Sequence, residues 1–216
     1  MRLTLPAAFM VILVLTEYGY GGDCGCTQSK TNHIRDSAKH RIHSMPLQPK
    51  RTVTVREMIN KWDITNAEFA QEPSHTYPRE DTLFRLTAYL HRTKLSDDDC
   101  DYHLEIAVSR SKTAKHVIVE IPNGNAYCEV RQKFLNGVIG KEKVKKDGTT
   151  GTIESIGRSE FTIFKDPPKI TVIGYGFLDT AHWSSADHKR GNKRHGSEYV
   201  WSLWEIHPVL DIQFDQ

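Results

Sequence analysis

From Thr82 onward the chain alternates apolar and polar side chains with a period of two, and this pattern restricts the fold more than any other feature. Such alternation predicts β-strands that bury one face. In the first segment, for example, Phe84 and Leu86 share one face while Arg85 and Thr87 share the other. We therefore expect a mainly β domain over residues 81–216, with strands within 82–90, 101–108, 116–121, 169–177 and 200–212.

One helix is expected between the third and fourth strands. Tyr127, Val130, Phe134 and Val138 follow one another at helical spacing. The resulting order, three strands, a helix and two strands, is that of an OB-like five-stranded closed barrel whose helix seals one end. An open five-stranded sandwich is the alternative.

The first 22 residues are typical of a signal peptide. An apolar run extends from Leu5 to Leu15, and a helix of that length rises only about 16 Å, too little for a stable membrane span. We therefore expect an exported protein, periplasmic or extracellular. A lipid anchor at Cys24 and an apolar start without targeting meaning are the alternatives.

Residues 23–80 predict a basic, polar linker with one short amphipathic helix. The part up to Arg51 has no apolar periodicity, so it cannot bury enough surface to offset chain ordering. Thr54 and Glu57 then form a capping-box pattern, and Met58 and Trp62 follow at helical spacing. We expect this helix to pack on the barrel.

The chain has four cysteines, and export would permit disulfides. Cys100 precedes one predicted strand and Cys128 follows the next, so a disulfide between them is geometrically plausible. Cys24 and Cys26 are too close for an easy bond and lack zinc-knuckle spacing. Two buried free thiols at Cys100 and Cys128 are the alternative.

A basic loop between the last two strands predicts a site for an oligomeric anion. The net charge of the whole chain is only +2, so binding of a polyanion must depend on local clusters. Cations for phosphates together with flat aromatic rings suit single-stranded nucleic acid or an acidic glycan. A solvated loop tip is the alternative. The predicted ligand-binding residues are Trp183, Lys189, Arg190, Lys193, Arg194 and Tyr199.

The loop between the first two strands is acidic and could hold a hard cation. Asp97, Asp99 and Asp101, with Glu120 of the third strand, would supply oxygen ligands. The loop lacks the glycine and the distal glutamate of an EF-hand, and a solvated turn is the alternative. If these groups point outward, they repel phosphate unless a metal neutralises them.

Two strands carry a histidine and a glutamate two residues apart, which places each pair on one face. The pairs are His103 with Glu105 and Glu205 with His207. Such pairs can bind a divalent metal, or act as acid and base in hydrolysis. Buried polar pairs that tie strands together are the alternative. The predicted metal residues are Asp101, His103, Glu120, Glu205 and His207, and no other cofactor is expected.

Several short stretches resemble a group of uncharacterised exported bacterial proteins. They are D-x-H-L at Asp101–Leu104, Glu120-Ile121-Pro122, G-x-G-F-x-D at Gly174–Asp179 and E-x-H-P-V at Glu205–Val209. The resemblance spans about residues 83–212 and implies an OB-like barrel and export, but no activity. A longer and more basic stretch follows His182 here than in the group. The resemblance points to Asp101, His103, Glu120, Asp179, His182, Glu205 and His207 as the residues of any site.

Three functions follow from these patterns. The first hypothesis is an exported OB-type module that binds an oligomeric anion without catalysis. The second is a metal-dependent hydrolase or nuclease that uses the His/Glu cluster. The third is a structural envelope protein without a ligand. No Ser-His-Asp order, phosphate loop or CxxC pair occurs in the sequence to favour another chemistry.

Overall fold

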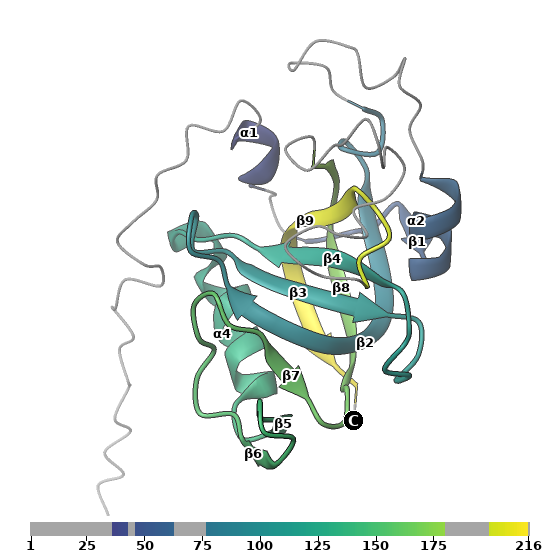
Figure 1. Ribbon diagram of the computed structural model, residues 1–216. Coiled ribbons are helices and arrows are strands. Elements are labelled where there is room, and N and C mark those ends of the chain that lie inside the picture. Colours follow the sequence, from purple (N-terminus) through teal and green to yellow (C-terminus); the bar gives the residue numbers. More distant parts are fainter. Residues whose placement is uncertain (1–35, 43–45, 63–76, 180–198, 216) are drawn as a thin grey trace, which may run out of the picture.

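The computed structural model describes residues 36–42, 46–62, 77–179 and 199–215 (Figure 1). Five long strands form a closed barrel in the order β3-β4-β9-β8-β2, and β2 pairs again with β3. The expectation of a mainly β, closed five-stranded barrel is confirmed. Its strands are β2 (Leu83–Leu95), β3 (Tyr102–Ala107), β4 (His116–Ile121), β8 (Lys169–Leu178) and β9 (Trp204–Phe214).

The core lies inside the barrel and follows the predicted alternation. Phe84, Leu86 and Leu90 of β2 share one buried cluster with Leu104 of β3. A short 3-10 helix (η1, Asn125–Tyr127) leads into α4 (Cys128–Val138), whose buried side chains include Phe134. Phe134 and Tyr127 belong to the same cluster, so α4 packs its apolar stripe on the barrel interior.

Glycines allow β8 and β9 to approach closely. A Cβ at Gly174 would collide with the backbone carbonyl of Pro208, and one at Gly176 would lie 2.7 Å from the carbonyl oxygen of Arg79. The register between β8 and β9 shifts on both sides of Gly174. These irregularities bend the strands as closure of a small barrel requires.

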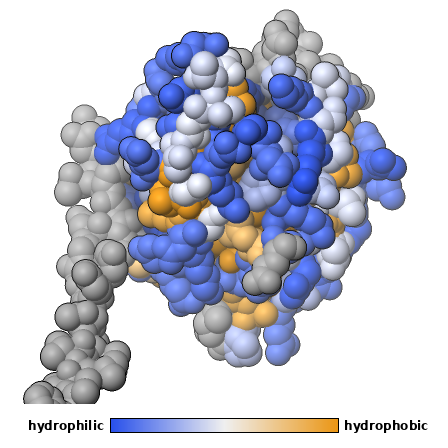
Figure 2. All heavy atoms as spheres, turned by 90° about the horizontal axis from the view of Figure 1, so that it is seen from below, coloured by the Kyte–Doolittle hydropathy of each residue, from blue (hydrophilic) through white to orange (hydrophobic). Residues whose placement is uncertain are grey.

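A small three-stranded extension, missed by the sequence analysis, continues the sheet beyond β2. It comprises β5 (Glu142–Val144), β6 (Thr150–Thr152) and β7 (Thr162–Phe164). Each strand has only three residues, too few for a period of two to stand out in a polar stretch. Figure 2 shows the molecule from below, where small apolar patches are separated by hydrophilic residues.

The segment before the barrel packs against it wherever it is described. β1 (Arg51–Val53) pairs in parallel with β2, and α2 (Val55–Lys61) buries Met58 in the core. The Thr54 side chain accepts a hydrogen bond from the Glu57 backbone N–H, as the capping pattern predicts. The helix α1 (Asp36–Lys39) ends in a buried lysine. The sequence predicted the helix α2 and its packing on the barrel, but not β1 or the burial of Lys39, because these depend on partners in the barrel.

Cys100 and Cys128 are both disulfide-bonded, which excludes the alternative of two free thiols. Their mutual pairing remains a prediction, and Cys24 and Cys26 lie outside the described residues. Residues 1–22 also lie outside them, so the signal peptide remains a prediction. In the described ranges, no helix has the length and apolar character needed to span a bilayer.

Candidate functional site

The barrel face opposite the core carries acids and imidazoles from three adjacent strands. On β3, Leu104 and Ile106 point into the core, so His103 and Glu105 lie on the other face. All six residues of β3 are buried, which shows that this outer face is also covered. The same alternation adds His116 and Glu120 of β4 and Glu205 and His207 of β9.

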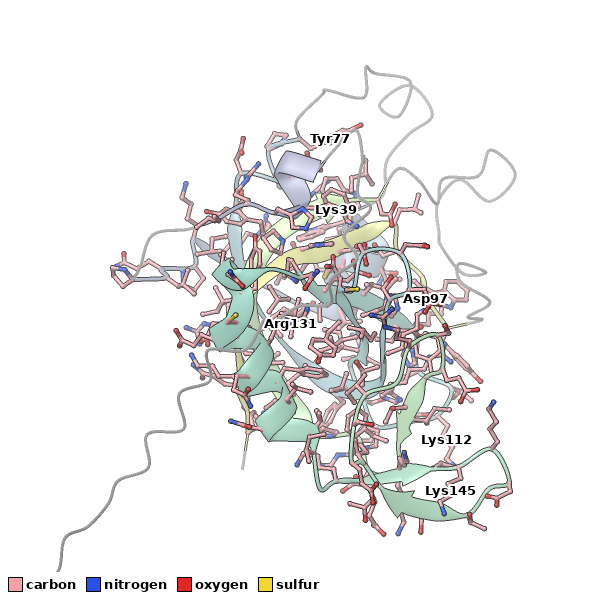
Figure 3. All side chains as sticks on the ribbon, turned by 90° about the vertical axis from the view of Figure 1, so that its left-hand side faces the viewer. Lys39, Tyr77, Asp97, Lys112, Arg131 and Lys145 are labelled. Carbon is pink, nitrogen blue, oxygen red and sulfur yellow. The ribbon has the colours of Figure 1, made fainter. Side chains whose placement is uncertain are left out.

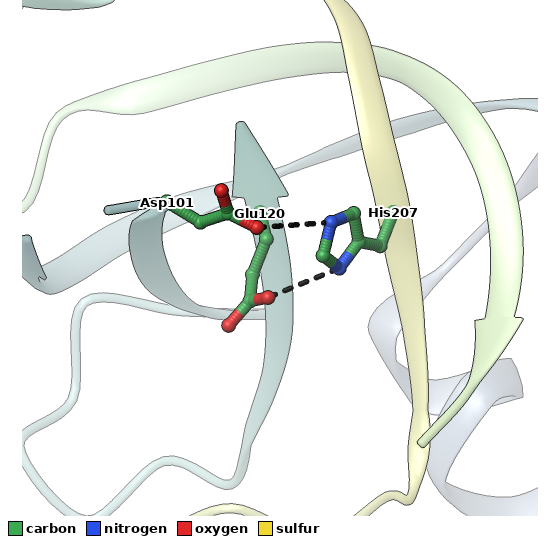
Figure 4. Close-up of side chains that lie close together, drawn as sticks. All are labelled: Asp101, Glu120 and His207. Atoms are coloured by element: carbon green, nitrogen blue, oxygen red, sulfur yellow. Dashed lines mark ion pairs between the residues drawn. The ribbon is translucent and has the colours of Figure 1, made fainter. Parts of the chain in front are cut away.

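Three of these residues form a compact group, the Asp101–Glu120–His207 cluster (Figure 4). Nε2 of His207 lies 3.3 Å from Oδ2 of Asp101, and Nδ1 lies 3.0 Å from Oε2 of Glu120. Each of the three residues offers one potential ligand atom, and these three atoms lie within 4.8 Å of one another. The ring of His207 thus sits between two carboxylates.

The backbone positions each member of the cluster. Asp101 ends the loop before β3, and its Oδ1 accepts a hydrogen bond from the Asn123 backbone N–H at 2.7 Å. That bond turns Oδ2 toward His207. The ring of Phe177 contacts the ring of His207 edge-on, with 5.4 Å between the two centroids. This contact limits rotation of the His207 ring.

A chain of alternating carboxylates and imidazoles continues from Glu120 across the sheet. Its Oε1 lies 2.8 Å from Nδ1 of His103, whose Nε2 is 3.6 Å from Glu105. Glu105 in turn lies 2.9 Å from both Nδ1 of His116 and Nε of Arg92. The cluster is therefore one end of a buried network that joins β2, β3, β4 and β9.

A buried cation from the segment before the barrel neutralises part of this acidity. Nζ of Lys39 lies 3.0 Å from Oδ2 of Asp99, and Oδ1 of Asp99 accepts the Asp101 backbone N–H at 3.2 Å. Burial alone would lower the pKa of Lys39, but Glu120, Asp99 and Asp101 together raise it. The ammonium therefore stays charged beside Asp99. Lys39 is labelled in Figure 3.

The protonation states follow from these contacts. Burial lowers the pKa of His207, but the carboxylates of Asp101, Glu120 and Glu205 outweigh it and raise that pKa well above its ordinary value. Burial raises the pKa of Glu120, yet His103 and His207 hold it well below the usual range. The contacts of His207 with both carboxylates have ion-pair distances. Burial raises the pKa of Asp101, and its contact with His207 offsets only part of this effect. Without a metal, the imidazolium of His207 is therefore paired chiefly with the carboxylate of Glu120.

The structure brings all five predicted metal residues into one region. Asp101, Glu120 and His207 form the cluster, His103 bonds to Glu120, and Glu205 lies 3.7 Å from His207. Of the acidic loop residues predicted to hold a hard cation, Asp101 joins the cluster, whereas Asp97 and Asp99 have other partners. Asp99 pairs with Lys39 instead, and Asp97 accepts a hydrogen bond from Ser159.

The predicted anion-binding loop is only partly described. Tyr199 is half-buried, and its ring centroid lies 5.4 Å from that of His116. Asp179, singled out by the resemblance, is buried directly after β8. The other residues of these predictions, Trp183, Lys189, Arg190, Lys193, Arg194 and His182, lie outside the described residues.

Sequence reasoning missed three members of the network: Lys39, Arg92 and His116. Lys39 lies in a polar stretch without periodicity, so no sequence signal marked it as buried. His116 begins a predicted strand, and Arg92 lies on β2 beyond the predicted end of its strand. Both side chains lie on the face opposite the core. A search for charged residues in phase with His103 and Glu120 would have found His116.

Comparisons with known proteins assign no family. No family model matches the chain, and neither curated proteins nor solved structures give a significant match. The geometry of the cluster therefore carries the functional argument.

Proposed function

We propose that this protein is a metal-dependent hydrolase whose divalent ion is held by Asp101, Glu120 and His207. The convergence of their ligand atoms within 4.8 Å is the observation that carries the proposal. Oxygen and nitrogen ligands at about 2.0–2.2 Å from a metal lie within about 4.4 Å of one another. Small side-chain adjustments would therefore complete the site.

The chemistry of the ligand atoms supports a metal over an ordinary polar contact. Oδ2 of Asp101 and both ring nitrogens of His207 are buried without a hydrogen-bond partner. These atoms lie in ion-pair contacts that lack hydrogen-bond geometry, and a metal ion could replace those contacts. Two carboxylates and one imidazole suit a first-row divalent ion such as Zn²⁺ or Mn²⁺.

The number of ligands favours catalysis over a purely structural metal. Structural zinc sites use four protein ligands, whereas catalytic sites use three and keep a position for water, whose pKa zinc lowers to about 7. His103 bonds to Glu120 and would fix the orientation of that ligand. The charged Lys39 nearby would stabilise negative charge that develops on a substrate.

The strand order supports an OB-type barrel, which forms part of the proposal. When the five barrel strands are numbered along the chain, their hydrogen-bonded order around the barrel is first, second, third, fifth, fourth. The third and fifth strands pair in parallel. OB barrels bind ligands on the face of the second and third strands. That face, on β3 and β4, is where the cluster lies.

Export is also part of the proposal. The apolar run at Leu5–Leu15 is its sequence signal, and the two disulfide-bonded cysteines support an oxidising compartment. Sequencing the amino terminus of the protein secreted by its native host would test it. A mature chain that still begins at Met1 would contradict the signal peptide.

Metal binding is tested first, on protein stripped with a chelator. Calorimetric titration with Zn²⁺ and Mn²⁺ should show one site, with proton release because the His207 imidazolium must lose its proton. His207→Ala and Asp101→Asn should abolish this site. His91→Gln is the matched control, because His91 is a buried histidine outside the cluster that bonds to the Ser109 carbonyl oxygen. Absence of stoichiometric binding would show that the network is an ion-pair structure without a metal.

Hydrolysis is tested separately with the metal-loaded protein. Bis(p-nitrophenyl) phosphate and p-nitrophenyl acetate should distinguish phosphodiester from carboxylic ester cleavage. We expect turnover that requires the metal and is lost in His207→Ala but kept in His91→Gln. Stoichiometric metal without turnover on either class would refute the hydrolase while leaving the metal site in place.

A further inference from the structure

A concave site away from the cluster, the cationic pocket, lies between β2, β7, the start of β4 and the loop after β3. Its volume is about 240 Å³. Lys112 lines it, and Figure 3 shows Lys112 well away from Lys39. No described residue that lines this pocket is acidic. The pocket is thus distinct from the cluster in both position and charge.

Arg110, Lys112 and Lys165 are available to an incoming anion, whereas Arg92 is held by the buried carboxylate of Glu105. Lys112 forms no ion pair in the described part of the chain. Arg110 pairs with Asp166 and Lys165 with Glu142, but both acids lie outside the pocket and are exposed, at 74% and 57%. Exposed pairs of this kind are weak, so a phosphate can replace them at little cost.

Aromatic rings supply a second kind of contact. His91, His116 and Tyr199 line the pocket as a ladder, with centroid separations of 4.6 and 5.4 Å. Burial lowers the pKa of His91, which keeps that ring neutral at neutral pH. Flat rings beside cations are the combination that binds a nucleobase together with its phosphate.

Apolar side chains also line the pocket, and its volume limits the size of the ligand that it can hold. Ile163, Phe164 and Pro167 are the apolar residues next to Lys165 that line the pocket. Ligand pockets for drug-sized molecules occupy about 300–1,000 Å³, so this pocket suits a smaller group. One nucleotide unit, partly open to solvent, fits that limit.

We infer that the cationic pocket binds a nucleotide, through its phosphate on Arg110 and Lys112 and its base on Tyr199. This inference does not depend on the proposed metal site. The two sites share one buried carboxylate network, since Glu105 contacts both Arg92 and His116 of the pocket and His103 beside the cluster.

Binding is measured by calorimetry on metal-free protein at low salt. AMP should bind, ribose 5-phosphate more weakly, and adenosine most weakly, because each of the last two keeps only one kind of contact. Arg110→Glu with Lys112→Glu should weaken AMP binding by about tenfold or more. Lys61→Glu with Lys146→Glu, which makes the same change of charge at exposed positions outside the pocket, should leave it unchanged.

Further variants keep the test decisive. Tyr199→Ala should reduce the preference for AMP over ribose 5-phosphate. If circular dichroism shows that the double charge reversal is unfolded, the milder Lys112→Ser replaces it. His207→Ala should retain AMP binding, which separates this inference from the metal site. No AMP binding by the native protein, or equal loss in the pocket and control variants, would overturn the inference.

Discussion

The carboxylate of Glu120 lies 3.0 Å from the ring of His207 because β4 and β9 pair in parallel at one point. Val119 is opposite Ile206 there, and both point into the core. The next residue on each strand therefore points to the other face, where the two side chains meet. The contact that defines the candidate metal site is thus a direct consequence of barrel closure.

Removal of Glu120 should strongly destabilise the metal-free protein. Glu120→Ala leaves the imidazoliums of His103 and His207 buried without this carboxylate, and loss of one partner from a buried ion pair typically lowers the free energy of unfolding by about 3–5 kcal/mol. Urea denaturation monitored by tryptophan fluorescence measures the change. Glu142→Ala, which removes one partner of an exposed pair with Lys165, should cost less than about 1 kcal/mol. Equal effects would show that the network contributes no stability.

The stability of the metal-free protein should fall in acid because of Glu105. Burial raises the pKa of Glu105, but His103, His116 and Arg92 outweigh this effect and hold that pKa well below its ordinary value. The unfolded chain therefore takes up a proton first as the pH falls. The contribution of Glu105 is complete above about pH 4.5 and is lost as the pH falls toward its lower folded pKa, with a slope of up to about 1.4 kcal/mol per pH unit.

Glu105→Gln should consequently flatten the decline in unfolding free energy between pH 5 and pH 3. Denaturant titrations at several pH values compare the variant with the native protein. Glu160→Gln, at a fully exposed ion pair with Lys146, should leave the slope as it is. A slope in Glu105→Gln identical to that of the native protein would contradict the prediction.

Gly174 should not tolerate a methyl group. Gly174→Ala would press a Cβ into the backbone carbonyl of Pro208 at the contact between β8 and β9, and overpacking of this kind costs about 1–3 kcal/mol. Thermal unfolding should show a lower midpoint. Gly157→Ala is the control, since nothing lies within 4 Å of its added Cβ, and it should be neutral or slightly stabilising. A native-like midpoint for Gly174→Ala would mean that the two strands are not so close.

Cys100 and Cys128 should resist alkylation in protein that is denatured without a reductant, because both are disulfide-bonded. Mass spectrometry of the proteolysed, unreduced protein should then find neither cysteine with a free thiol. The linked peptides also test whether the two pair with each other, as the sequence predicts, or with Cys24 and Cys26. Alkylation of either residue before reduction would contradict the structure.

Local alternation in the sequence was enough to predict the barrel strands and their two faces. Phe84 and Leu86 occupy the core as predicted, because side-chain direction in a strand depends only on its period of two. The same rule placed His103 with Glu105 and Glu205 with His207 on shared faces. These predictions needed no knowledge of the neighbouring strands.

The tertiary structure decided what the sequence could not. Parallel pairing of β4 with β9 brings His207 to Glu120, and the packing of the segment before the barrel brings Lys39 to Asp99. Both contacts join residues that are distant in the chain, so no local pattern encodes them. Burial of the outer face decided their chemistry as well, since the same carboxylates and imidazoles would titrate near their ordinary pKa values in water.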